Sequence, residues 1–178
     1  MINLTGKDSA SAPTFDAPLD MLRACHDRIM DQCATLQKLM SHLPMHGSDS
    51  QAQQAAQAIM RYFDTAGQMH HQDEELDLFP LLQACNHPDA NELMQHLHGE
   101  HQAMDALWLR LRPQLQDIAE GKATLLERML VADFSLAYGR HVMTENNYLL
   151  PAVARLLTAE QLQHIGRNMA QRRGVTPA

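Results

Sequence analysis

Apolar residues recur every three or four positions along four long stretches of the chain, a spacing that places them on one face of an α-helix. This pattern predicts helices over residues 18–43, 51–85, 90–119 and 125–157, followed by a short fifth helix that ends near Arg172. The connections between the stretches are short. Long amphipathic helices with short connections are typical of an all-α fold. We therefore expect an up-down-up-down four-helix bundle with a short extra C-terminal helix.

Prolines and polar residues mark the expected helix boundaries. Pro18 suits the first turn of a helix, whereas Pro44 is expected to end the first one. Pro80 and Pro113 fall inside the second and third stretches, where we expect them to disturb the helix. Three pairs have the spacing of a helix capping box and are expected to begin helices: Ser50 with Gln53, Thr124 with Glu127, and Thr158 with Gln161.

Length and composition narrow the class of protein. The 178 residues favour one domain, with an irregular N-terminal segment expected over residues 1–17 and the bundle over residues 18–173. The formal charge of −7 argues against a nucleic-acid partner, and no apolar run reaches the length of a membrane span. A protein partner is compatible with this composition, and the oligomeric state stays open. Three cysteines without a CxxC pair are expected to be reduced thiols in a cytoplasmic protein: Cys25, Cys33 and Cys85.

One motif occurs twice in the chain, over residues 70–80 and 141–151. Each copy reads His, three residues, Glu, three residues, Leu, then Phe or Leu, then Pro. Residues four apart lie on the same face of a helix, so each copy places an imidazole beside a carboxylate. Both pairs continue the apolar face of their helix. They are expected to point into the core rather than towards solvent.

The first and third stretches each carry one histidine on the apolar face, His26 and His101. Burying all six polar groups without partners would cost several kcal/mol. A metal cluster resolves this cost, because it binds neutral imidazoles and ionised carboxylates. The expected metal ligands are the following six: His26, His70, Glu74, His101, His141 and Glu145.

The ligand types fit iron, zinc or manganese. If each glutamate bridges two ions and each ion takes two histidines, every ion has four protein ligands. Four ligands fill a zinc tetrahedron but leave octahedral iron with open positions. Those positions suit an oxo or hydroxo bridge and a small ligand such as dioxygen or nitric oxide. Two iron ions are therefore the expected cofactor, with zinc and manganese as the alternatives.

Polar residues next to the six expected ligands are expected to have other roles. His71 and His98 lie beside the apolar faces and are expected to meet solvent or to support the ligands from outside. Asp105, one turn after His101, is a candidate outer partner or weak extra ligand, and its role stays open. Tyr148 is expected to pack in the core, where together with Leu97 it would shape the pocket.

The doubled motif and the two single histidines resemble the hemerythrin-like, or HHE cation-binding, family. The resemblance covers residues 18–157, and the run His141-x3-Glu145-Asn146-Asn147 is particularly similar to bacterial proteins that repair iron-sulfur centres. It implies a four-helix bundle holding a non-haem di-iron centre, with the same six ligands. Unlike the oxygen-carrying hemerythrins, this chain has Leu97 where they have a second histidine on the third helix. One iron is then expected to be more open.

Three functions follow as alternatives. The first is a di-iron protein that binds or reacts with dioxygen or nitric oxide in sensing, storage or stress response. The second is an enzyme or iron donor in nitric-oxide detoxification or iron-sulfur cluster repair. The third is a structural zinc-binding bundle. A ferritin-like ferroxidase fits less well, because that class uses Glu-x-x-His whereas here the histidine comes first.

Overall fold

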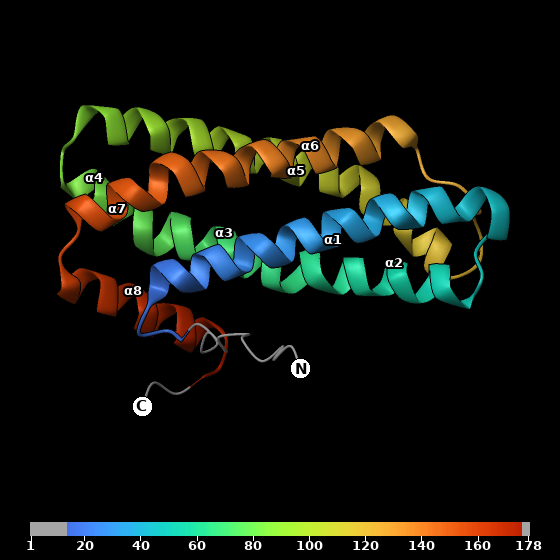
Figure 1. The fold of residues 1–178 in the computed structure, drawn as a ribbon, viewed down its shortest axis with the longest axis horizontal. Helices are drawn as coiled ribbons and strands as arrows, with labels where there is room; N and C mark the ends of the chain where they lie inside the picture. The colour runs from blue at the N-terminus through green and yellow to red at the C-terminus, as the bar shows by residue number, and fades with distance from the viewer. Residues whose placement is uncertain (1–13, 176–178) are drawn as a thin grey trace, which may run out of the picture.

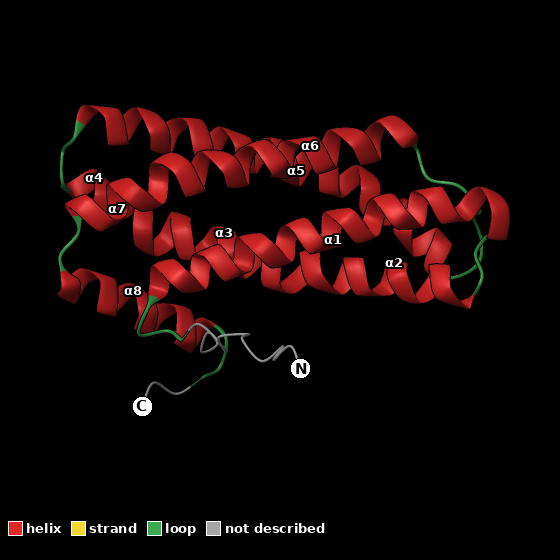
Figure 2. Ribbon diagram, viewed as in Figure 1, coloured by secondary structure: helices red, strands yellow, loops and turns green. Residues whose placement is uncertain are grey.

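Four helical runs lie side by side along the long axis of the molecule, and a shorter helix, α8, packs at one end (Figure 1). The computed structural model describes residues 14–175, which form helices and loops but no strand (Figure 2). The expectation of an all-α fold is confirmed. The bounds are α1 (Pro18–His46), α2 (Ser50–Tyr62), η1 (Phe63–Gly67), α3 (Gln68–Gln72), η2 (Asp73–Leu78), α4 (Phe79–Ala84), α5 (Pro88–Ala119), α6 (Arg128–Thr144), η3 (Glu145–Leu149), α7 (Leu150–Leu156) and α8 (Ala159–Arg172).

The first run is α1, the second extends from α2 to α4, the third is α5, and the fourth extends from α6 to α7. Each run packs against two others: α1 contacts α2 and α6, and α5 contacts the same two helices. Their apolar faces enclose two separate groups of buried side chains. The larger core cluster includes Ile29, Leu36, Ile59, Phe63, Met104, Leu111 and Phe134. The smaller core cluster includes Leu22, Leu78, Leu82, Leu97, Leu149, Val153, Ile165 and Met169. On every run, the predicted ligands fall in the sequence between members of these two clusters.

The second and fourth runs contain short π-helical segments, η2 and η3, directly before Pro80 and Pro151. A proline ring in an α-helix clashes with the carbonyl four residues earlier, and its nitrogen cannot donate. The wider π turn moves that carbonyl away, so the run continues past the proline. The disturbance expected at Pro80 is therefore a π segment before the proline. At Pro113 the α-helix simply continues to Ala119.

Two of the three expected capping boxes are wrong. The second run is capped by Asp49 instead of Ser50, and the Asp49 carboxylate accepts the N–H of Ala52 at 2.8 Å. The fourth run begins at Arg128, three residues later than predicted, and no side chain caps it. The N–H of Glu127 instead donates to the side chain of Gln114 at 2.8 Å. A partner on another helix has replaced a local cap, and local sequence spacing carries no sign of this.

Other boundaries agree more closely with the expectation. The capping box of Thr158 with Gln161 is confirmed at the start of α8. Helix α1 extends to His46, two residues beyond Pro44, because the proline removes only its own N–H from the hydrogen-bond pattern. Of the segment expected to be irregular, residues 1–13 lie outside the described residues, and residues 14–17 form a turn.

Helix α8 lies against α1 and against η2. Gly166 on α8 permits the chain before α1 to cross it, since a side chain there would collide with the carbonyl of Phe15. The three cysteines are free thiols, with Cys25 and Cys33 buried. No helix within residues 14–175 is long and apolar enough to span a membrane.

Candidate metal centre

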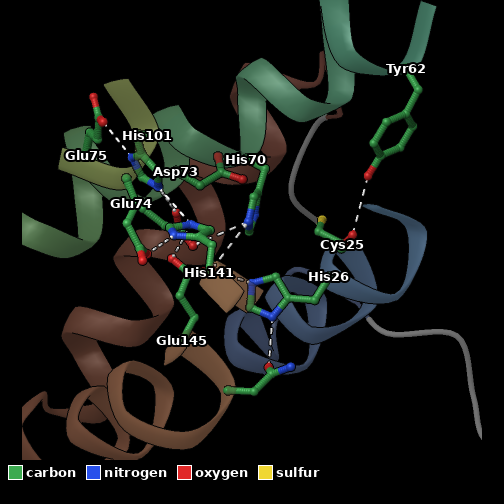
Figure 3. Close-up of polar contacts among 12 residues, drawn as sticks. Cys25, His26, Tyr62, His70, Asp73, Glu74, Glu75, His101, His141 and Glu145 are labelled. Atoms are coloured by element: carbon green, nitrogen blue, oxygen red, sulfur yellow. Dashed lines mark hydrogen bonds and ion pairs between the residues drawn. The ribbon is translucent and has the colours of Figure 1, made fainter. Parts of the chain in front are cut away.

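The six predicted ligands converge inside the bundle, with their side chains turned towards one another (Figure 3). They come from all four runs, and none is more than 2% exposed. The order along the chain is His26 on α1, His70 on α3, Glu74 on η2, His101 on α5, His141 on α6 and Glu145 on η3. Both glutamates therefore lie in the π segments that precede the prolines of the repeated motif.

The six residues form two overlapping groups of four. One joins the two glutamates with His26 and His70, and the other joins them with His101 and His141. Within each group, one ligand atom from every residue lies within 4.8 Å of the others. Each group could hold one ion. Because both groups contain the same two carboxylates, those carboxylates lie between the two positions.

The oxygens of Glu145 divide between the two histidine pairs. Oε2 lies 2.9 Å from Nε2 of His26 and 3.8 Å from Nε2 of His70. Oε1 lies 3.1 Å from Nε2 of His141 on the other side. Two ligands of one ion, at bond lengths of about 2.0–2.2 Å, lie about 3.0–3.6 Å apart. The observed separations are close to this range.

Glu74 divides its oxygens in the same way. Oε1 lies 3.5 Å from Nε2 of His70, and Oε2 lies 3.3 Å from Nε2 of His101. The Nε2 atoms of His101 and His141 are 3.1 Å apart. Each glutamate thus turns one oxygen towards each histidine pair, as a carboxylate must do to bridge two ions.

Many of these inward atoms lack a partner with hydrogen-bond geometry in the described part of the chain. They are both oxygens of Glu74 and of Glu145, Nε2 of His26 and both ring nitrogens of His70. A buried polar atom without a partner is costly, and native proteins rarely leave several together. A cation between the oxygens and nitrogens satisfies them at once. The donor set therefore fits a metal.

The two carboxylates differ in their affinity for protons. Burial raises the pKa of Glu74 well above its usual range, and the charge of Glu145 raises it further. Burial would also raise the pKa of Glu145, but contacts with His141 and His26 hold it well below its usual range. Without a cation, one carboxyl therefore keeps its proton, because two buried carboxylates this close cannot both be ionised.

Three of the four histidines are held by polar partners at their outward nitrogen. The Nδ1–H of His26 donates to Asn146 at 2.8 Å, that of His101 to Glu75 at 2.6 Å, and that of His141 to Glu100 at 2.9 Å. A proton on Nδ1 leaves Nε2 as the lone-pair nitrogen facing inward, which is the form that binds metals.

The roles of Glu75 and Glu100 were not predicted from the sequence. Glu75 comes from the second run and supports His101 on α5, while Glu100 on α5 supports His141 on α6. Their only local signal is adjacency to Glu74 and His101 in the sequence. In both pairs, the glutamate and the histidine that it supports lie on different helices, so the pairing depends on tertiary packing.

Of the neighbouring residues, Tyr148 differs from expectation, His98 agrees with it, and Asp105 lies apart from the site. Tyr148 is 65% exposed and does not wall the site, whereas Leu97 is fully buried in the smaller core cluster. Asp105 is exposed and belongs to none of the possible metal-binding groups among the described residues. His98 is exposed and contacts Glu75, so it meets solvent as expected while also touching an outer partner of the site.

His71 does not face solvent, and its contact with His101 fits the other role expected for it, support of the ligands from outside. It was expected beside the apolar face, because consecutive helical residues point about 100° apart. It is instead only 6% exposed. Its helix faces α5 and α6 as well as α1, and the ring of His71 lies against that of His101. A helix inside a bundle can bury more than one face, which a single-face pattern does not capture.

Residues 17–153 match the hemerythrin HHE cation binding domain, which is well over half of the chain, and the chain therefore belongs to this family. An uncharacterised protein of Haemophilus influenzae is 30% identical over 162 residues, covering 91% of this chain and 93% of that protein. Domains of this family bind metal cations, typically iron. The family resemblance and the expectation of metal binding are confirmed at that level.

Proposed function

We propose that the chain holds two iron ions in an up-down-up-down four-helix bundle and uses them to bind or react with dioxygen or nitric oxide. One observation carries the proposal. Both groups of four possible ligands contain Glu74 and Glu145, and each carboxylate turns one oxygen to each group. A single ion at either histidine pair would face only one oxygen of each carboxylate. Two ions account for both oxygens and all four histidines.

The charge of the site favours two divalent or trivalent cations. Burial is the main cause of the low pKa of His70 and His101, so these imidazoles are neutral and free to bind metal. Within residues 14–175, Glu74 and Glu145 are the carboxylates shared by both groups of possible ligands. Cation binding removes the repulsion between them, which otherwise forces a proton onto Glu74.

Each position has two nitrogens and two oxygens from the protein, which leaves octahedral iron with vacant coordination sites. Iron would supply reversible binding or redox chemistry for a diatomic ligand, whereas the protein holds the ions and keeps bulk water out. Leu97, fully buried, and Phe79, whose ring lies parallel to that of His101 at 6.1 Å, provide apolar surroundings next to this histidine.

The test is metal content by elemental analysis together with an aerobic absorption spectrum of the same sample. The proposal requires two irons per chain after anaerobic loading with ferrous iron, and visible absorption that changes when nitric oxide is added. Glu92→Gln, on the exposed surface of α5, is the control and should keep both irons. A colourless protein that binds zinc in preference to iron would instead support a structural zinc site.

A further inference from the structure

The proposed ligand set leaves one buried histidine unused. His71 is 6% exposed, and its Nε2 lies buried without a hydrogen-bond partner in the described part of the chain. A buried imidazole nitrogen without a partner is unfavourable, so its presence calls for a group that is absent from the polypeptide. The surroundings of His71 indicate where that group binds.

His71 lies at the second histidine pair of the site. One ring nitrogen each of His71, His101 and His141 lie within 4.8 Å of one another. The ring of His71 stacks on that of His101, with centroids 4.0 Å apart and planes 15° from parallel. It meets the ring of His141 edge-on at 6.1 Å. On its other side, the Tyr138 ring lies nearly parallel at 6.1 Å.

This stacking argues against His71 as a third histidine ligand of the same ion. A metal–nitrogen bond of about 2.0–2.1 Å lies in the plane of the imidazole ring. The planes of His71 and His101 are almost parallel and displaced from each other, so one ion cannot lie in both. If His101 binds the ion, the ring of His71 lies beside that position without being a third histidine ligand.

We infer that His71 donates a ring N–H hydrogen bond to the small ligand bound beside the ion at the His101 and His141 position. This inference rests on the proposed function, because the ligand is held by the ion. A neutral imidazole carries one ring N–H that it can donate. Dioxygen and azide offer only acceptor atoms, which such a donor fits.

The experiment compares iron-loaded proteins with azide as the probe ligand. His71→Leu removes the N–H, His71→Gln restores a donor in a side chain of similar reach, and the control His164→Leu removes an exposed imidazole on α8. Iron per chain is measured by elemental analysis, and the azide dissociation constant by absorption titration. All variants should keep two irons. His71→Leu should weaken azide binding about tenfold, and His71→Gln should recover most of it.

The outcomes separate this inference from the proposal on which it rests. Loss of one iron in His71→Leu would identify a metal ligand and overturn the hydrogen-bond role. Equal azide affinity in the wild type and in His71→Leu, with two irons bound, would also overturn it, as would a loaded wild type that binds no azide. A wild type that takes up no iron would contradict the proposed function itself.

If His71→Leu does not fold, a His71→Gln variant that binds azide like the wild type still supports the donor role, and one that binds it far more weakly opposes it.

Discussion

At the scale of single residues, Glu74 has two incompatible roles that depend on the metal. In the metal-free chain it is a buried acid that keeps its proton, because burial and Glu145 raise its pKa well above the usual range. In the proposed metal-bound state it is an ionised bridge. The same side chain therefore links metal affinity to pH.

This linkage gives a prediction for Glu74→Gln. The amide keeps the size of the side chain and the neutrality of the protonated acid, so the metal-free variant should melt no lower than the metal-free wild type. Both ion positions lose an oxygen ligand, and iron content should fall from two per chain to one or fewer. Elemental analysis and thermal melts check the two parts. Two irons bound in Glu74→Gln would contradict the bridging role.

A second prediction concerns protons. Since the pKa of Glu74 is raised well above its usual range, cation binding should release the proton that this carboxyl holds. Affinity should then fall as the pH is lowered, because protons compete with the cation, and should level off above the metal-free pKa of Glu74. Calorimetry in two buffers of different ionisation enthalpy counts the protons. No release, or the same release from Glu74→Gln, would refute this coupling.

The residues that were predicted and those that were missed differ in a physical way. All six proposed ligands sit on the main apolar face of their helix, so helical spacing alone was enough to find them. His71 lies on a second buried face, and Glu75 and Glu100 act across helices. The spacing of residues within one helix cannot predict burial on a second face or contacts with another helix.

At the scale of secondary-structure elements, α8 is clamped to the segment that carries Glu74. Asp73, the fully buried neighbour of Glu74, is held by Arg173 at 2.6 and 3.1 Å and by Arg172. Arg172 also reaches Asp77 at 2.8 Å. Burial nevertheless raises the pKa of Asp73 against the effect of both arginines. The pairing therefore only partly offsets the cost of burying this carboxylate. Helix α8 lies beyond residues 17–153, the part of the chain that matches the family domain.

Removing the ion pair between Asp73 and Arg173 should destabilise the fold. Arg173→Met removes the bidentate partner and leaves Asp73 with Arg172 alone, and we expect a loss of about 3 kcal/mol in the free energy of unfolding. Arg167→Met, exposed on the same helix, should change it little. Urea unfolding of the metal-free proteins measures both. A change in Arg173→Met as small as in the control would show that the ion pair contributes little.

The elements also mark how far local sequence can predict structure. Periodicity located the long helical runs, and although the disturbance expected at Pro113 is absent, Pro80 indicated where the second run is disturbed. The form of that disturbance, a π segment holding each glutamate, was not predicted, because it depends on how far the run must turn to face the core. The clamp of α8 was missed for a similar reason, since Asp73 and Arg173 are one hundred residues apart.

At the scale of the whole molecule, the candidate metal site separates the two apolar cores. On α1, His26 lies between Leu22 of the smaller core cluster and Ile29 of the larger one. On α5, His101 lies between Leu97 and Met104 in the same sense. In the two runs that carry the glutamates the order along the chain is reversed: the larger core cluster comes first, at Phe63 and Tyr138, and the smaller one follows the ligands, at Leu78 and Leu149. Without cations, the layer that joins the two cores consists of polar groups that lack good partners.

Metal removal should therefore weaken the coupling between the two ends of the bundle. The end built on the smaller core cluster has the shorter helices α4 and α7 and depends on α8 for cover. In the metal-free protein, amides of α4, α7 and α8 should exchange hydrogen faster than those of α2 and the later part of α5. Iron loading should slow exchange mainly in α4, α7 and α8, because the ions connect both ends of the bundle through one layer of ligands.

Hydrogen exchange followed by mass spectrometry, with and without iron, measures this difference helix by helix. Glu74→Gln is the matched control: without a bridged pair of ions, added iron should no longer slow exchange in α4, α7 and α8. If iron protects all helices of the wild type equally, the bundle opens as one unit and the metal layer does not divide it. If it protects only residues next to the ligands, the ions stabilise the site without coupling the two cores.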